Sequence, residues 1–298
     1  MPEWDADVVV DEPLVYALLV EQFPQLDASS ARLLGEGWDN AVWVVEERWA
    51  FRFPRRDVAI PGVERELALL PQLAPLLPVA IPVPTFVGTP SVRFPWPFFG
   101  APLLRGDEPA EVELTYDARA SLGSNLGRFL RALHDVELDA DLPDDPIRRA
   151  DTRFRVAFTR ERIAASEELG VWTAPPEVAR ILAAGERLPP SRRRAVTHGD
   201  LHVRHVLVED GALSGVIDWG DMCRSDPAID LMLVWSLLHP VGRASFAAEY
   251  GEVEEESLLR ARVLALFLGL TLALYARDVG HVRLERECLA GLERTLIE

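Results

Sequence analysis

The pattern of apolar and polar positions changes near residue 103 of the chain. Before that point, a helical spacing over residues 13–23 precedes short runs in which apolar and polar residues alternate, as in strands buried on one face. These runs lie at residues 31–34, 41–45 and 49–53, with an edge strand predicted near residues 85–88. The first part of the chain is therefore expected to be rich in β-structure.

Prolines mark the limits of the other elements in this part. A helix is predicted over residues 62–70, ending before Pro71, because the residue before a proline avoids helical dihedral angles. Further along, Pro95, Pro97 and Pro102 bracket a stiff, extended connector. The boundary between two domains is placed at its end.

After the connector, helical spacing dominates, interrupted by a β-like stretch over residues 195–219. The predicted helices cover residues 115–136, 152–169, 176–184, 227–238, 243–250, 257–276 and 282–297. The longest apolar run, 263–276, is shorter than the roughly 20 residues of a membrane span, so it is interpreted as a core helix. The sequence thus predicts an α+β protein with a β-rich lobe over residues 1–103 and a mainly helical lobe over residues 104–298.

The charge balance narrows the classes of partner. The chain has 48 acidic and 31 basic residues and a formal net charge of −17, which disfavours nucleic-acid binding and favours a cationic or metal-bound partner. All 31 basic residues are arginines, for which codon usage is the simplest explanation. Any role that usually needs a lysine must here be filled by arginine.

Cysteine usage and the N-terminal residues bear on the compartment. There are two cysteines, Cys223 and Cys288, and no C-x-x-C pair, which argues against a disulfide framework or a cysteine-rich zinc site. No basic stretch precedes an apolar one at the N-terminus, so no signal peptide is predicted. We expect a cytoplasmic protein without a membrane partner.

Most of the polar chemistry lies in the β-like stretch. Three histidines and an aspartate occur within residues 198–205, just before an apolar run, and a Glu-Asp-Gly turn at 209–211 returns the chain to Asp218. Because a hairpin brings its two ends together, Asp200 and His205 are expected to meet Asp218. Converging carboxylates and imidazoles suit a divalent metal and a general base. The alternative is a set of polar turn residues beside a buried hairpin.

Three motifs in this region carry a resemblance to a known family. They are His-Gly-Asp-Leu-His at 198–202, Ile-Asp-Trp-Gly-Asp at 217–221 and Ser-Asp-Pro-Ala-Ile-Asp-Leu at 225–231. In this order and spacing they resemble the aminoglycoside phosphotransferase family, and with the N-terminal part the resemblance covers roughly residues 30–240. It implies a protein-kinase-like two-lobe fold and phosphorylation of a small-molecule hydroxyl group by a nucleoside triphosphate with Mg²⁺.

The resemblance also implies roles for individual residues. Asp200 takes the place of the family's catalytic aspartate, and Asp218 that of its metal-binding aspartate. His198 and Asp230 are expected to support the catalytic loop. The family usually has asparagine as a second metal ligand five residues after the catalytic aspartate, whereas this chain has His205.

That histidine is also found in the macrolide phosphotransferase branch of the family, to which the chain is most similar. The same branch has a strand ending Arg-x-Pro-Arg-Arg, present here at residues 52–56. The Asp-Trp-Gly-Asp motif differs from that branch, so the acceptor stays open between a macrolide, an aminoglycoside and another small molecule. His205 is expected near the metal, although Mg²⁺ prefers oxygen ligands.

In the N-terminal lobe, Gly35 and Gly37 lie between two strands and would let the backbone approach phosphates; a simple tight turn is the alternative. Arg52 is on the strand face opposite Phe51 and Phe53, where the kinase-like fold places its phosphate-binding lysine. Glu66 on the next helix is expected to pair with it.

Alternatives remain for these residues, since Glu64 is a rival for the pairing and both glutamates would fit a solvated helix face. The backbone of the connector near Ala101 and Leu103 is expected to hydrogen-bond a purine.

The sequence therefore predicts an ATP- or GTP-dependent O-phosphotransferase. A metabolite kinase with the same fold and a non-catalytic nucleotide-binding pseudokinase are the alternatives. If the acceptor is cationic, four acidic residues are candidates for holding it: Asp221, Asp226, Glu249 and Asp278.

Overall fold

The computed structural model describes residues 6–37, 39–138 and 142–298. These residues fall into two compact units, one within residues 1–75 and 80–104 and the other within residues 76–79 and 105–298. The assignment of nucleotide binding to the first part of the chain and of catalysis to the second remains a prediction.

The first unit is built on one antiparallel sheet with the strand order β1-β2-β3-β5-β4. Its elements are α1 (Glu12–Gln22), β1 (Arg32–Glu36), β2 (Asn40–Val45), β3 (Trp49–Pro54), α2 (Ile60–Leu73), β4 (Phe86–Gly88) and β5 (Phe98–Pro102). Short 3-10 turns in this part of the chain lie at Ala28–Ser30, Asp57–Ala59 and Ala74–Leu76. The predicted edge strand is β4, and it lies at the edge of the sheet.

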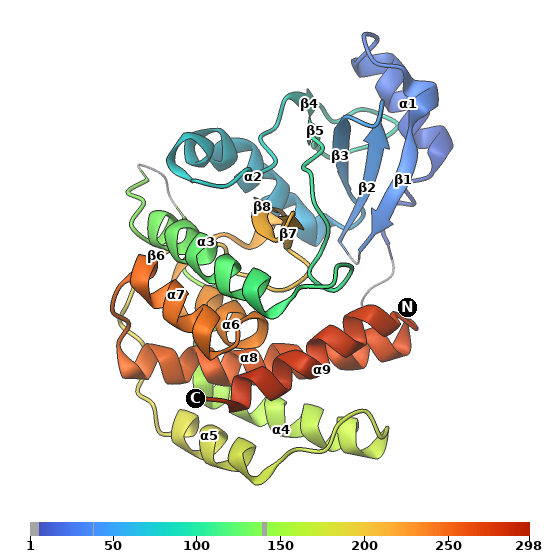
Figure 1. The fold of residues 1–298 in the computed structure, drawn as a ribbon. Coiled ribbons are helices and arrows are strands. Elements are labelled where there is room, and N and C mark those ends of the chain that lie inside the picture. The colour runs from blue at the N-terminus through green and yellow to red at the C-terminus, as the bar shows by residue number, and fades with distance from the viewer. Residues whose placement is uncertain (1–5, 38, 139–141) are drawn as a thin grey trace. The chain divides into compact units, whose positions relative to one another are not determined.

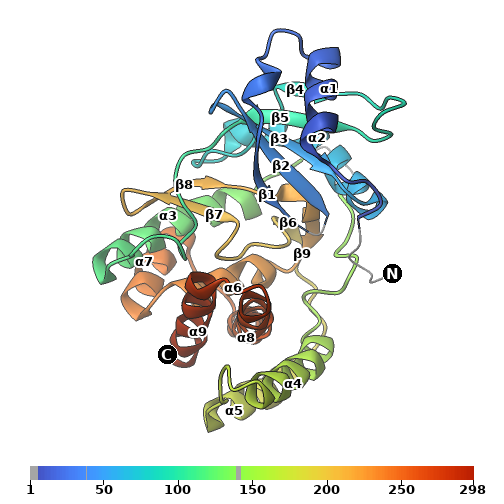
Figure 2. The same cartoon turned by 90° about the vertical axis from the view of Figure 1, so that its right-hand side faces the viewer.

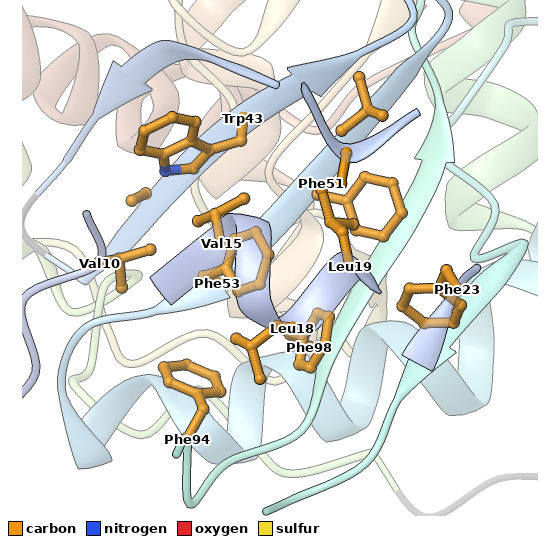
Figure 3. Packing of buried hydrophobic residues seen from close by; sticks show 13 residues of the cluster. Val10, Val15, Leu18, Leu19, Phe23, Trp43, Phe51, Phe53, Phe94 and Phe98 are labelled. Carbon is orange, nitrogen blue, oxygen red and sulfur yellow. The ribbon is translucent and has the colours of Figure 1, made fainter. Parts of the chain in front are cut away.

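Alternation along β3 separates two environments. Phe51 and Phe53 are fully buried in a cluster with Val15, Leu18 and Leu19 of α1, as Figure 3 shows. Successive side chains of a strand point to opposite faces, so Arg52 lies on the other face, where Val63 of α2 packs with Phe99 and Ala101 of β5. The face predicted for Arg52 is therefore correct.

Two expectations for this unit were wrong. The stretch before Pro102 is not a mere connector: residues 98–102 form strand β5 between β3 and β4. Its prolines lie at or outside the strand ends, and its buried Phe98 and Phe99 stabilise the sheet. Helix α2 also continues through Pro71 to Leu73. Burial of Leu70 and Leu73 offsets the hydrogen bond that the proline cannot make.

The second unit is mainly helical, with two small antiparallel strand pairs, β6 with β9 and β7 with β8 (Figures 1 and 2). Its elements are α3 (Tyr116–His134), α4 (Thr152–Glu168), α5 (Pro176–Glu186), β6 (Ala195–Thr197), β7 (Val206–Glu209), β8 (Ala212–Val216), a 3-10 turn at Trp219–Asp221, β9 (Cys223–Ser225), α6 (Ala228–Leu237), α7 (Pro240–Tyr250), α8 (Glu255–Asp278) and α9 (Val282–Leu296).

Helix α8 is the centre of this unit and packs against α4, α5, α6 and α9. It is the one helix of the described residues that is long and apolar enough to cross a membrane, with a mean hydropathy of 1.8 over its best window. Half of that window is buried inside the protein, as in the core helices of soluble proteins, so this is weak evidence for a membrane span.

Candidate active site

The β7–β8 hairpin brings the two ends of the polar segment together. Val206 pairs with Val216, and the Ile217 N–H donates to the His205 carbonyl oxygen at 2.9 Å. The turn follows the Asp-Gly signal, since Asp210 and Gly211 both have positive φ (52° and 77°). His205 and Asp218 are therefore neighbours, as predicted from the hairpin.

Asp230, in the first turn of α6, holds the loop that carries Asp200. Its carboxylate is fully buried and accepts hydrogen bonds from the backbone N–H groups of His198 (2.9 Å) and Gly199 (3.1 Å). The His198 ring fixes the same loop, because its Nε2–H donates to the Ile217 carbonyl at 2.9 Å and its Nδ1 accepts the Asp200 N–H at 3.3 Å. Both residues are placed as supports of this loop.

The close turn at Gly199 requires a glycine. Its φ is 90°, a conformation that residues with a side chain rarely adopt. A Cβ atom at this position would also lie 2.1 Å from the Asp221 carbonyl oxygen. The absence of a side chain thus allows the Asp200 loop to pack directly on the segment that follows Asp218.

A buried relay supports Asp230 from behind, and the sequence analysis missed it. His134 at the end of α3 contacts Asp230 through Nε2, which lies 3.1 Å from Oδ2, the oxygen that also accepts the His198 N–H. The Nδ1 atom of His134 lies 2.8 Å from the Tyr250 hydroxyl oxygen. With Nε2–H donating to the carboxylate, Nδ1 accepts the Tyr250 O–H. Burial raises the pKa of Tyr250, so its hydroxyl stays protonated as this relay needs. The three residues are far apart in sequence, and no local pattern reveals their contact.

Asp200 is partly open to solvent, with 32% of its side chain exposed. Its Oδ2 lies 3.5 Å from His202 Nε2 and 3.7 Å from His205 Nδ1. Burial opposes ionisation of this carboxyl group, but the His202 N–H beside it and the positive charge of Arg149 outweigh that effect and hold the pKa well below its ordinary value. Asp200 is thus ionised at neutral pH.

His205 faces Asp218 with a lone pair. Its Nδ1–H donates to the Asp200 carbonyl oxygen at 2.7 Å, and burial lowers the pKa of the ring, which favours the neutral form. The neutral ring then presents an unprotonated Nε2 to Asp218 Oδ2 at 3.3 Å. Two acceptor atoms that face each other at this distance fit a cation bound between them.

The backbone at Asp218 favours the same interpretation. This residue has φ 63° and ψ 64°, the left-handed conformation that costs a non-glycine residue about 1–2 kcal/mol. Such strain is typical of functional positions that the surrounding structure fixes. The donor set of a carboxylate and an imidazole fits a divalent metal ion.

The acidic residues proposed for a cationic acceptor have different surroundings. Asp221 and Glu249 each form an ion pair with an arginine, Arg149 and Arg128 respectively. Asp226 is 1% exposed, lies 3.3 Å from Arg260 Nε and caps α6 through the Ala228 N–H, so it is structural. The expectation for Asp226 was wrong for this reason, while Asp278 is exposed at the end of α8.

In the first unit, Arg52 pairs with Glu66. The Arg52 Nε atom lies 3.3 Å from Glu66 Oε2, and Glu66 is fully buried while 14% of the Arg52 side chain is exposed. Glu64 is exposed on the same helix. The structure therefore selects Glu66 as the partner of Arg52 over the rival that the sequence left open.

The glycine positions lie at the end of β1. Gly35 has open space where a Cβ would be, and the Gly37 N–H donates to the Asn40 carbonyl oxygen at 2.8 Å. Neither has a positive φ. These glycines are thus not required by the turn itself, and the room beside Gly35 leaves the backbone accessible.

The backbone of the two connector residues is already used by the sheet. The Leu103 N–H donates to the Arg48 carbonyl oxygen at 2.8 Å, and Ala101 lies opposite Ala50. Hydrogen-bonded pairs alternate along an antiparallel ladder, so Ala101 also directs its backbone groups to β3. The Leu103 N–H is thus already bonded within the sheet, and purine binding by the backbone near Ala101 and Leu103 stays a prediction.

A profile of the phosphotransferase enzyme family matches residues 30–265. The match spans both units and most of the chain. The chain belongs to the phosphotransferase enzyme family. This phosphotransferase is a small-molecule kinase that uses a nucleotide, as the motifs around Asp200 indicate.

Solved structures of similar fold agree with this. The GDP and kanamycin complex of APH(2")-IIia has a TM-score of 0.68 at 23% identity, covering 94% of this chain and 97% of that one. Macrolide 2'-phosphotransferase type I has a TM-score of 0.62 at 23% identity, with 97% and 98% covered. Macrolide 2'-phosphotransferase MphH from Brachybacterium faecium has a TM-score of 0.60 at 25% identity, with 95% and 98% covered. The phosphotransferase thus has the protein-kinase-like fold predicted for it.

Proposed function

We propose that this protein transfers the γ-phosphoryl group of ATP or GTP to a hydroxyl group of a small molecule. The observation that carries the proposal is the convergence of Asp200, His205 and Asp218 at the open end of the β7–β8 hairpin. Phosphoryl transfer needs mainly positioning and charge neutralisation, and such a cluster supplies both. A cytoplasmic location of the protein is part of the same proposal.

Asp200 is the group proposed to act on the acceptor. Its carboxylate is ionised and partly exposed, so it can accept a hydrogen bond from the incoming hydroxyl and orient the oxygen for in-line attack. The depressed pKa makes it a weak base, which suits a loose transition state in which the proton leaves late. The proton of the hydroxyl group would pass to a carboxylate oxygen of Asp200.

Asp218 and His205 are the residues proposed to hold Mg²⁺. When bound, the ion would neutralise charge on the triphosphate. Asp218 would supply the oxygen that Mg²⁺ prefers. The unprotonated Nε2 of His205 would bind the ion directly or accept a hydrogen bond from a water molecule on it. The hydrogen bond from His205 Nδ1 to the Asp200 carbonyl fixes this orientation of the ring.

The nucleotide contacts are proposed for the first unit. Arg52 would bind phosphate oxygens, steadied by the buried Glu66. The backbone near Gly35 and Gly37 would lie along the phosphates. Since the Leu103 N–H is committed to β3, the purine would use the neighbouring Pro102 carbonyl and Leu104 N–H.

The acceptor is tested with a panel. The protein, ATP or GTP and Mg²⁺ are incubated with macrolides, aminoglycosides and hydroxylated amino alcohols or sugar amines, and phosphorylated product is measured by mass spectrometry. A product with an antibiotic supports a drug-modifying enzyme, and a product only with a metabolite supports the alternative metabolite kinase. No product and no Mg²⁺-dependent hydrolysis of either nucleotide would refute the proposed activity.

The first prediction concerns His205. His205→Asn should retain substantial Mg²⁺-dependent activity, since an amide oxygen restores a hard ligand beside Asp218. His205→Ala should need on the order of 10-fold more Mg²⁺ for half-maximal rate. The measurement is rate against Mg²⁺ concentration. Activity with Mn²⁺ alone, lost in His205→Asn, would instead favour direct imidazole ligation.

The second prediction concerns Arg52 and Glu66. Arg52→Ala should raise the KM for nucleotide by about 10- to 100-fold, because a charge-assisted hydrogen bond contributes about 1.5–3 kcal/mol and the chain has no lysine to replace it. Glu66→Gln should act more weakly, since Glu66 only steadies the arginine.

Glu64→Gln, on the exposed face of the same helix, is the matched control and should leave the KM unchanged. A KM in Arg52→Ala equal to that of the native protein would exclude the phosphate role of Arg52.

A further inference from the structure

His202 lies two residues after Asp200 and has been given no catalytic or metal-binding role so far. Only 12% of its side chain is exposed. The Arg204 N–H donates to its Nδ1 at 3.2 Å, so that nitrogen carries no proton and the neutral ring holds its proton on Nε2. Nε2 is the atom that faces Asp200 Oδ2, at 3.5 Å.

The ring is also held on its flat side. Its centroid lies 3.7 Å from that of His205, with an angle of 31° between the planes. His205 is itself fixed by its hydrogen bond to the Asp200 carbonyl. The direction of the His202 Nε2–H bond is therefore set by the backbone of its own loop and by a neighbouring ring.

His202 could either ligate a metal ion or donate a hydrogen bond to Asp200, and its contacts distinguish these two roles. Asp200, His202 and His205 offer ligand atoms within 4.8 Å of one another, which would suit a metal ion. Coordination through His202 Nε2 would place the ring proton on Nδ1, against the Arg204 N–H that now donates there. The hydrogen-bond pattern thus favours His202 as a donor to the carboxylate.

We propose that His202 is a positioning residue that fixes the Asp200 carboxylate by donating to Oδ2, so that Oδ1 is the oxygen presented to the acceptor hydroxyl. Within the described residues, the contacts of both imidazoles fall on Oδ2. The inference rests on the proposed function, because it concerns the same carboxylate.

The test compares His202→Phe with His202→Gln. Phenylalanine keeps a ring that can stack on His205 and removes both nitrogens, whereas glutamine keeps an N–H group that can reach Oδ2. The readouts are kcat and nucleotide KM for hydrolysis of Mg-ATP and Mg-GTP, with water as acceptor, and for transfer to kanamycin and a macrolide. We expect kcat to fall about 10-fold in the Phe variant, with an unchanged KM, and to recover partly in the Gln variant.

His239→Phe is the matched control. Like His202, His239 accepts a backbone N–H at Nδ1, here from Gly242 at 3.2 Å. It also stacks on a ring, that of Tyr116, with 3.5 Å between the centroids. Unlike His202, it caps helix α7. This variant should lose thermal stability as His202→Phe does and keep its kcat. It therefore separates the loss of a ring nitrogen from the loss of a donor to Asp200.

A double variant gives the decisive comparison. If His202 acts through Asp200, then Asp200→Asn with His202→Phe should be no slower than Asp200→Asn alone. An unchanged kcat in His202→Phe, or losses that multiply in the double variant, would overturn the role of His202 while the native protein remains active. A native protein without hydrolysis or transfer would instead overturn the proposed function, and this role with it.

Discussion

Asp200→Asn should lower the rate of phosphoryl transfer by a factor on the order of 100 or more, the usual contribution of a positioned general base. The substitution keeps the shape of the side chain and removes the charge that accepts the proton of the acceptor. Nucleotide affinity should change little, since the proposed nucleotide contacts belong to Arg52 and the connector backbone. The measurement is kcat together with the Kd for nucleotide.

Asp210→Asn is the control for this experiment. Asp210 is exposed in the turn of the same hairpin with a φ of 52°, a conformation that asparagine adopts readily. That variant should retain the kcat of the native protein. Equal rates for Asp200→Asn and Asp210→Asn would remove Asp200 from the mechanism.

Gly199→Ala should abolish transfer through a backbone effect rather than a chemical one. A Cβ atom would meet the Asp221 carbonyl oxygen at 2.1 Å, so either the Asp200 loop or the segment after Asp218 must move. We expect a loss of stability above about 4 kcal/mol, in the range that single substitutions reach only through a defined structural conflict. Thermal unfolding and kcat are both measured.

Gly211→Ala separates the two causes of that loss. Gly211 also has a positive φ, 77°, but the nearest atom to a Cβ there is a methyl group at 3.4 Å. It should cost only the strain of a left-handed residue, about 1–2 kcal/mol, with a normal kcat. Similar losses in the two variants would mean that the packing of Gly199 on Asp221 has no special weight.

Local sequence signals predicted those parts of the molecule in which neighbours in sequence determine the structure. The Glu-Asp-Gly turn at 209–211 predicted the hairpin that brings His205 to Asp218. Alternation in residues 49–53 predicted the face of Arg52. In both cases a signal within a few residues determines the local structure: the turn residues in the first, and the alternation of side chains along a strand in the second.

Other features depend on contacts between distant segments. Strand β5 was missed because its flanking prolines look like a loop, whereas its burial between β3 and β4 decides its structure. The choice between Glu64 and Glu66 also needed the packing of α2 on the sheet. His134 meets Asp230 across 96 residues of sequence and Tyr250 across 116, and a single sequence holds no signal for such contacts.

The presence of Arg52 beside Glu66, in a chain without lysine, has a practical consequence for chemical labelling. A guanidinium group stays protonated throughout the range in which proteins fold, and it is a poor nucleophile compared with an amine. Some nucleotide probes transfer an acyl group to a lysine beside the phosphates. They would find no lysine side chain to react with, because the sequence contains none. Profiling of nucleotide-binding proteins with such reagents would therefore overlook this enzyme even when its site is filled, and a dicarbonyl reagent directed at arginine is the appropriate probe.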